Sequence, residues 1–137
     1  DTASQASPEE EEGEEVVAIS TWLSKPDVIQ AFRCHEVKVN GYMYASNLLV
    51  TDSHIYVLRD IPGRKGFAHI VVRRLLSAIV KITARKKHPE LITFKYGVPE
   101  GDNLVISDMD RFLIPNATEA TKLVSQQILK QLKGKDG

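Results

Sequence analysis

Two neighbouring β-strands between Gly41 and Asp60 are the feature that most constrains the fold. The stretch is rich in aromatic, β-branched and leucine side chains, which suit a pleated, half-buried surface: Tyr42, Tyr44, Leu48, Val50, Ile55, Tyr56 and Val57. Asp52-Ser53 separates the two apolar runs, where a short hairpin turn is expected. Because an isolated hairpin is not stable in water, the rest of the chain must supply further strands or a helix to cover it.

Further strands are predicted on both sides of this hairpin. Phe32 to Val39 alternates in one phase up to Cys34 and in the opposite phase from Val37, which indicates a β-bulge, and Asn40-Gly41 indicates a tight turn. Ile61 to Gly66 is a loop. Later strands are expected at Ala68 to Arg74, Ser77 to Ala84, Leu91 to Tyr96, and at either Leu104 to Ser107 or Arg111 to Ile114, with Gly97 to Asn103 loose.

Two helical segments are expected. Ser24-Lys25-Pro26-Asp27 resembles a helix start and predicts a short turn over Pro26 to Gln30, with Trp22 capping the core. Asn116 is a good N-cap for a C-terminal helix that Gly134 would end. Its apolar stripe is Ala117, Ala120, Val124, Ile128 and Leu132. About seven antiparallel strands followed by one helix predict an α+β fold, with the helix packed over a bent sheet or a partly open barrel.

The charge divides the chain into an acidic leader and a basic domain. Residues 1–15 hold seven acidic residues and no basic one, which leaves 11 acidic against 18 basic residues in the remainder, a net charge of +7. We expect 1–15 to be a disordered leader, which is either a solvating linker or a screen for the basic domain. The folded domain is expected at 16–133, followed by a disordered tail at 134–137.

Several functional classes find little support in the sequence. No apolar run approaches the ~20 residues of a membrane helix, and the N-terminus does not resemble a signal peptide. Cys34, the single cysteine, favours a reducing intracellular compartment and is expected in the core. The four histidines lack metal-ligand spacing, and Cys34-His35 would point to opposite faces of a strand. We therefore expect no enzyme, no cofactor and no metal, and dispersed bases without aromatic motifs argue against nucleic acid.

The same residues carry a resemblance to known proteins. Tyr44 to Leu58 resembles strands two and three of the pleckstrin-homology (PH) superfold and its GRAM, PTB and EVH relatives. Glu36 to Asn47 and Ile61 to Ala68 resemble the C-terminal domain of a TBC-family trafficking adaptor, over about residues 16–133.

This resemblance implies a monomeric adaptor domain. It would act in endosome-to-Golgi transport, on the cytosolic side of trans-Golgi and endosome-derived membranes. The implied partners are a tail peptide of the WASH complex and a phosphoinositide, with the 4-phosphate as the favoured isomer. The alternative is a module that binds protein only.

Candidate lipid contacts come from basic turns. Arg64-Lys65 and Arg85-Lys86-Lys87 are expected in turns at one end of the barrel, near Lys38 in the first hairpin. Together they would attract an anionic membrane. Tyr42 to Leu49 has no base, however, which departs from the common phosphoinositide-binding PH pattern. The alternative to lipid contact is that both turns are ordinary solvated turns.

A protein partner would use one of two modes. The first is strand addition to the edge of Ser77 to Ala84, beside the C-terminal helix. Its candidate residues are Ser77, Ile79, Lys81, Thr83, Leu123 and Gln127. The second is a hydrophobic pocket formed by Trp22, Phe94 or Phe112.

Overall fold

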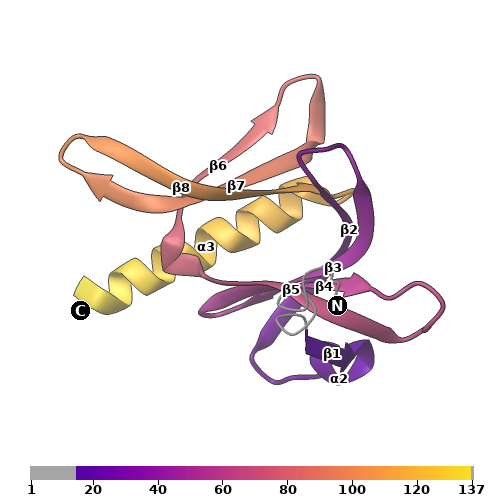
Figure 1. The fold of residues 1–137 in the computed structure, drawn as a ribbon. Coiled ribbons are helices and arrows are strands. Elements are labelled where there is room, and N and C mark those ends of the chain that lie inside the picture. Colours follow the sequence, from indigo (N-terminus) through magenta and orange to yellow (C-terminus); the bar gives the residue numbers. More distant parts are fainter. Residues whose placement is uncertain (1–14, 137) are drawn as a thin grey trace, which may run out of the picture.

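The computed structural model describes residues 15–136, which form one antiparallel sheet and a long C-terminal helix (Figure 1). The elements are β1 (Glu15–Ala18), α2 (Ile19–Leu23), β2 (Val28–Val37), β3 (Met43–Thr51), β4 (His54–Asp60), β5 (Phe67–Leu75), the 3-10 turn η1 (Leu76–Ala78), β6 (Ile79–Arg85), β7 (His88–Glu100), β8 (Asn103–Leu113) and α3 (Ala117–Asp136). The strand order is β1-β5-β4-β3-β2-β8-β7-β6. The end strands β1 and β6 do not pair with each other, so the sheet is open.

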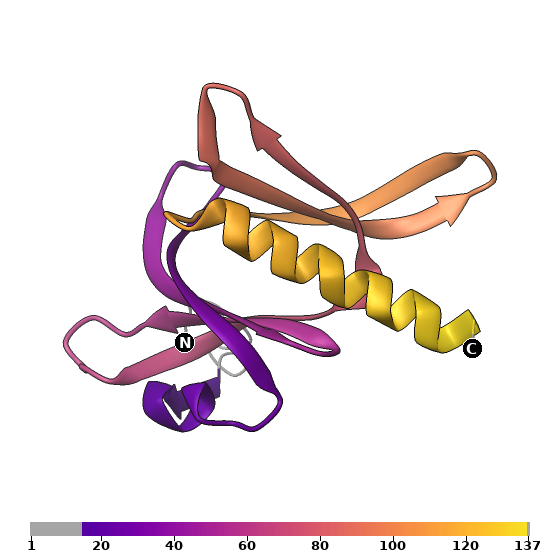
Figure 2. The same ribbon diagram turned by 180° about the vertical axis from the view of Figure 1, so that it is seen from behind.

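The predicted α+β class is confirmed, with eight strands where about seven were expected. The additional strand is β1, which pairs with β5 from Glu15↔Ile70 to Ala18↔Phe67. Except for Glu15, the acidic leader lies outside the described residues. Seen from both sides, α3 runs between the β6–β8 part of the sheet and the β3–β5 part (Figures 1 and 2).

Both predicted hairpin turns are confirmed. In the β3–β4 hairpin, Thr51 Oγ1 accepts hydrogen bonds from the backbone N–H groups of Ser53 and His54, at 3.1 and 2.9 Å. In the β2–β3 hairpin, Asn40 Oδ1 accepts the N–H of Tyr42 at 3.0 Å. Gly41 has φ 91°, a conformation that favours glycine. Local side-chain chemistry therefore fixes both turns.

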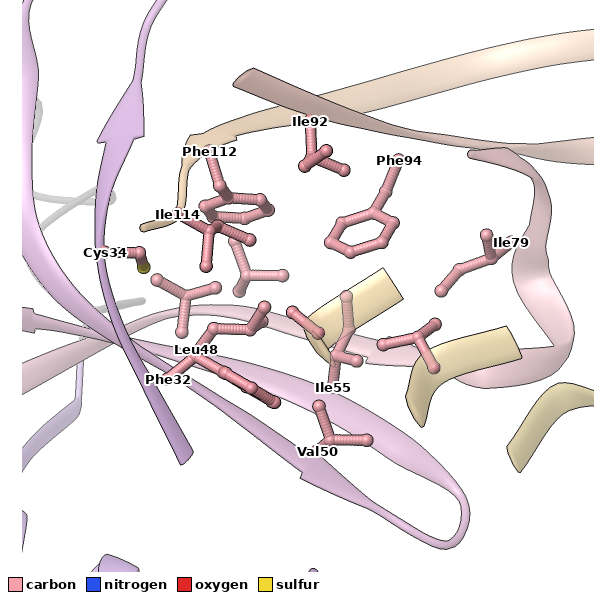
Figure 3. Close-up of a cluster of buried hydrophobic side chains, with 14 of the residues drawn as sticks. Phe32, Cys34, Leu48, Val50, Ile55, Ile79, Ile92, Phe94, Phe112 and Ile114 are labelled. Atoms are coloured by element: carbon pink, nitrogen blue, oxygen red, sulfur yellow. The ribbon is translucent and has the colours of Figure 1, made fainter. Parts of the chain in front are cut away.

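The main core lies between the inner face of the bent sheet and α3 (Figure 3). Phe94 and Phe112 pack with ring centroids 5.7 Å apart, and both are fully buried. Both halves of the sheet contribute, together with Ala117, Ala120 and Val124 of α3. Because α3 fills the space inside the bend, the sheet buries its inner face without closing into a barrel.

A smaller core lies on the opposite face of β3, β4 and β5. It contains Leu49, Leu58, Ala68 and Ile70, against which Trp22 and Tyr56 pack. The rings of Trp22 and Tyr56 meet edge to face, with centroids 5.1 Å apart. Trp22 therefore packs in this second core.

The predicted helical turn at Pro26 to Gln30 is wrong. The short helix α2 comes earlier, at Ile19–Leu23, and Val28 already pairs with Thr51 in the sheet. Pairing with β3 offers these residues backbone hydrogen bonds along a whole strand, whereas a single helical turn leaves most of its groups unpaired.

The predicted bulge inside Phe32 to Val39 is also wrong. Phe32, Cys34 and Glu36 are all buried and keep one phase, whereas Val39 is 97% exposed. The register shift of β2 lies instead between Val28 and Gln30. The buried residue near the end of β2 is Glu36, and a carboxylate at this position hides the alternation of buried and exposed residues in the sequence.

The C-terminal third is more regular than expected. Gly97 to Asn103 is not loose, because β7 runs to Glu100, and both candidate last strands belong to β8. The helix continues past Gly134 to Asp136, so the predicted end is wrong. Leu132 of the predicted stripe is 52% exposed, whereas Gln127 is buried.

Gly97 should be required where β7 shifts register against β8. A Cβ atom at this position would lie 2.0 Å from the Val105 carbonyl oxygen, which belongs to the backbone. We expect Gly97→Ala to lower the free energy of unfolding by about 1–3 kcal/mol, measured by urea denaturation.

Gly134→Ala is the matched control, because a Cβ there meets nothing within 4 Å. It should leave the stability unchanged or raise it by up to about 1 kcal/mol. Equal effects of the two substitutions would contradict the steric argument.

Candidate functional site

A cavity of about 490 Å³ lies at the polar end of the sheet interior. It is lined by Glu36 and Lys38 of the first hairpin region, Arg59 of β4, Val71 to Arg74 of β5 and Asp110 of β8. Its charged side chains come from four separate segments of the chain. The cavity is therefore a product of the tertiary fold.

A buried ion pair forms one wall of this cavity. The Glu36 side chain is only 3% exposed, and its Oε1 accepts hydrogen bonds from Arg59 Nη2 at 2.8 Å and Nε at 3.2 Å. Lys38 Nζ lies 3.4 Å from the other carboxylate oxygen. The Arg59 guanidinium also lies over the ring of Tyr44, 4.1 Å from its centroid. Two cations thus neutralise one buried carboxylate.

A second network reaches this cavity through Arg74 and Asp110. Arg74 pairs with Asp108, lies 4.0 Å from Asp110 Oδ2, and stacks over the Tyr96 ring. The Tyr96 hydroxyl donates a 2.7 Å hydrogen bond to Asp110. Burial raises the pKa of both Asp110 and Tyr96 above their ordinary values. The phenol therefore stays protonated near neutral pH and acts as a donor, not as a nucleophile.

The exposed edge of β6 faces α3 across a groove of about 370 Å³. Its walls are β6 and the start of β7 on one side and the first two turns of α3 on the other. The lining residues are Ile82, Thr83, Ala84, Pro89, Ile92, Ala117, Thr118, Thr121 and Ser125. Small side chains on the helix leave room beside the free strand edge.

The predicted peptide residues have different positions around this groove. Thr83 lines it, whereas Ser77 lies in η1 and Lys81 pairs across the sheet with Lys95. Three others belong to the interior: Ile79 and Gln127 are buried, and Leu123 packs against the core. The alternative pocket of surplus aromatics is ruled out for Phe94 and Phe112, which are both fully buried.

A basic depression of about 360 Å³ lies on the other face of β6, β7 and β8. It is lined by Thr83, Arg85, Leu91, Thr93, Lys95, Met109 and Arg111. A smaller depression continues it toward the first hairpin and shares Met109 and Arg111 with it. Its other lining residues are Glu36, Val37, Lys38, Val39 and Asp110, so it carries both signs of charge. Three strands thereby bring Arg85, Lys95 and Arg111 together.

The predicted lipid residues divide into two groups. Lys38 and Arg85 line these adjoining depressions, and Lys86-Lys87 forms the neighbouring β6–β7 turn. Arg64-Lys65 lies in the β4–β5 turn, where the Arg64 guanidinium lies over the Phe67 ring. Figure 1 shows the two hairpins projecting in different directions.

Sequence reasoning missed Lys95 and Arg111. The available signal was their position next to Phe94 and Phe112, since neighbours in a strand point to opposite faces.

The part of the chain that the structure describes shows no evident catalytic centre. No three His, Cys, Asp or Glu side chains converge among residues 15–136. Burial raises the pKa of the Cys34 thiol to about 12, so the thiolate is scarce at neutral pH. Over the same residues, no helix has the length and apolar character needed to cross a bilayer.

Comparison with known proteins identifies similar domains. Residues 17–135 match the family described as TBC1 domain family member 23 C-terminal. A crystal structure of the C-terminal domain of an unknown protein from Leishmania infantum has a similar fold, with a TM-score of 0.54 and 14% sequence identity. The similarity covers 88% of this chain and 90% of that chain.

The buried pair of Glu36 and Arg59 can be tested by mutation. Arg59→Met leaves the Glu36 carboxylate buried with Lys38 alone, so we expect a loss of about 3–5 kcal/mol in the free energy of unfolding. Adding Glu36→Leu should restore much of this loss, because the uncompensated charge is removed. Urea denaturation of both single variants and the double variant measures the coupling.

Arg33→Met serves as the control, since Arg33 pairs with Asp60 on the surface and its side chain is 56% exposed. It should cost no more than about 1 kcal/mol. A similar loss for Arg33→Met and Arg59→Met would show that burial of the pair is not what matters.

Proposed function

Because this chain belongs to the TBC1 domain family member 23 C-terminal family, we propose that it is a non-catalytic adaptor domain of vesicle trafficking between endosomes and the trans-Golgi. Its proposed ligands are a tail peptide of the WASH complex and a phosphoinositide. We also propose that residues 16–133 form a PH-like module. In support, β2 to β8 follow the order β5-β4-β3-β2-β8-β7-β6, and the helix comes last.

The free edge of β6 beside α3 is the observation that carries the adaptor proposal. An unpaired strand edge offers a row of backbone N–H and C=O groups to an extended peptide. The adjoining groove has Thr118, Thr121 and Ser125 on its helical wall, which leave room for peptide side chains. Main-chain hydrogen bonds would supply affinity and the groove would supply selectivity.

Filling the groove should weaken peptide binding. Thr121→Trp places an indole in the groove, whereas Lys122→Trp adds the same side chain at the next, exposed position of α3. We expect Thr121→Trp to reduce the affinity for a WASH tail peptide at least tenfold, or ~1.4 kcal/mol, by fluorescence anisotropy.

Lys122→Trp should bind the peptide like the unmodified chain. If the two tryptophan variants bind with equal affinity, the groove is not the peptide site.

The phosphoinositide would be held by the basic turns, with Arg85 to Lys87 and Lys38 on one side of the molecule and Arg64-Lys65 on another hairpin. Each base near an anionic membrane contributes roughly 1 kcal/mol, so several weak contacts would supply recruitment that a bound peptide reinforces. The domain would then reside at the cytosolic surface of trans-Golgi and endosome-derived membranes.

Headgroup binding can be followed residue by residue. In an NMR titration with soluble short-chain phosphatidylinositol 4-phosphate, we expect amide shifts at Lys38 and at 85–88, or at 64–65. Lys86→Glu with Lys87→Glu should reduce the shifts at 85–88, and it should change WASH peptide affinity far less than Thr121→Trp does.

If no amide shifts at millimolar lipid, the headgroup proposal fails. The domain is then a protein-interaction module alone.

A further inference from the structure

Over β6 and the adjoining parts of β7 and β8, one face of the sheet carries basic side chains and no acidic ones. On the neighbouring part of the same face, Arg33 of β2 pairs with Asp60 of β4. Cross-strand partners share a face, and the register aligns Met43, Val37, Arg111, Thr93 and Thr83 in one row across β3, β2, β8, β7 and β6. We call this surface the outer face and define it by Val37, Lys81, Thr83, Arg85, Leu91, Thr93, Lys95, Met109, Arg111 and Leu113. Four of these ten residues are basic and none is acidic.

The acidic residues of β8 lie on its other face. Asp110 lines the interior cavity and accepts the hydrogen bond from the buried Tyr96, and Asp108 pairs with Arg74. On the same side as Asp110, Glu36 is buried between Lys38 and Arg59. Each of these three carboxylates has a hydrogen-bonding or ion-pair partner of its own, and Glu36 and Asp110 also line the small depression that Arg111 borders.

The β2–β3 turn adds apolar side chains at the border of the outer face. Val39 is 97% exposed, Tyr42 is 65% exposed and Met43 is 48% exposed. Val39 lines the same small depression as Met109 and Arg111, so the apolar turn and the basic strands are continuous. Exposing three neighbouring apolar side chains to water is unfavourable, so such a patch often marks a site that another apolar environment covers.

We propose that the outer face and the β2–β3 turn lie on an anionic lipid bilayer, with Val39 and Tyr42 entering the interfacial region and Arg111, Lys95 and Arg85 meeting lipid phosphates. This rests on the membrane role proposed above and names the surface and the mode of contact. Affinity for an anionic bilayer increases both with the apolar area that enters it and with the number of basic side chains near its phosphates.

A nucleic acid would contact the basic residues of this surface but not its apolar residues. Phosphates would engage the bases, but base stacking needs aromatic platforms, and none of the ten residues of the outer face is aromatic. The exposed Val39 and Met43 would remain in water. The bilayer therefore accounts for more of the observed side chains.

Insertion of the turn can be measured directly with an environment-sensitive label. Cys34 is buried and its thiol pKa is raised, so in the 137-residue chain Val39→Cys offers one reactive thiol for the fluorophore NBD. With vesicles of phosphatidylcholine and 30% phosphatidylserine, we expect a blue shift and quenching by lipids brominated on their acyl chains. The control is the same label at Leu129→Cys on α3, whose parent side chain is 58% exposed, and it should show neither change.

Vesicle co-sedimentation then tests the two parts of the surface separately. Val39→Asp with Tyr42→Ser should weaken binding at least tenfold, and Lys95→Gln and Arg111→Gln roughly fivefold each. The controls are Leu129→Asp and Lys122→Gln on α3, which should bind vesicles like the unmodified chain. Shifts with the soluble short-chain lipid should persist in Val39→Asp/Tyr42→Ser, because that ligand has no bilayer to enter.

The results separate this inference from the function proposed above. If soluble lipid shifts the amides but the Val39 label stays in water, headgroup binding stands and the inference is wrong. If vesicles bind but the turn and α3 variants lose binding equally, the inference is also wrong. Binding of single-stranded RNA that depends on Lys95 and Arg111, together with no vesicle binding, would overturn it in favour of nucleic acid.

Discussion

The packing of α3 inside a bent but open sheet is the constraint on which the other features depend. Ala117, Ala120 and Val124 fill the space between the two parts of the sheet, so neither β1 nor β6 needs a further strand to bury the inner face. Within residues 15–136, the same arrangement leaves the β6 edge unpaired and places the helix beside it. The groove proposed for a peptide is thus a direct consequence of how the core is covered.

The two faces of the sheet differ in charge around β8, because its aspartates lie on the inner side whereas Arg111 lies on the outer face. On the inner side, Arg59 and Arg74 pair with Glu36, Asp108 and Asp110. The 490 Å³ cavity is lined by both signs of charge, with Lys38 and Arg73 as further bases. Lys95 and Arg111 point the other way. The outer face of β6, β7 and β8 therefore carries a group of basic side chains, and it is the surface that we propose for an anionic ligand.

The sequence predicts features that are set locally and misses those set by distant partners. Asn40-Gly41 and Asp52-Ser53 specify their turns through neighbouring atoms, and the stripe of α3 is visible in its spacing. The predicted change of phase in β2 is wrong because Glu36 is buried, and its partner Arg59 is 23 positions away in the sequence. Thr83 was the only predicted peptide residue that lines the groove, since the helical wall depends on how α3 is rotated.

The two proposed binding surfaces meet at one strand. Thr83 lines both the groove beside α3 and the basic depression on the outer face, and Arg85 follows two positions later. A peptide strand added to β6 would extend the sheet next to Lys81 and Arg85. Negative charge on such a peptide would then lie within a Debye length, about 8 Å at physiological salt, of the bases assigned to lipid. Because any coupling between two sites is reciprocal, the peptide and the membrane would modulate each other's affinity, and its sign would depend on the charge of the peptide.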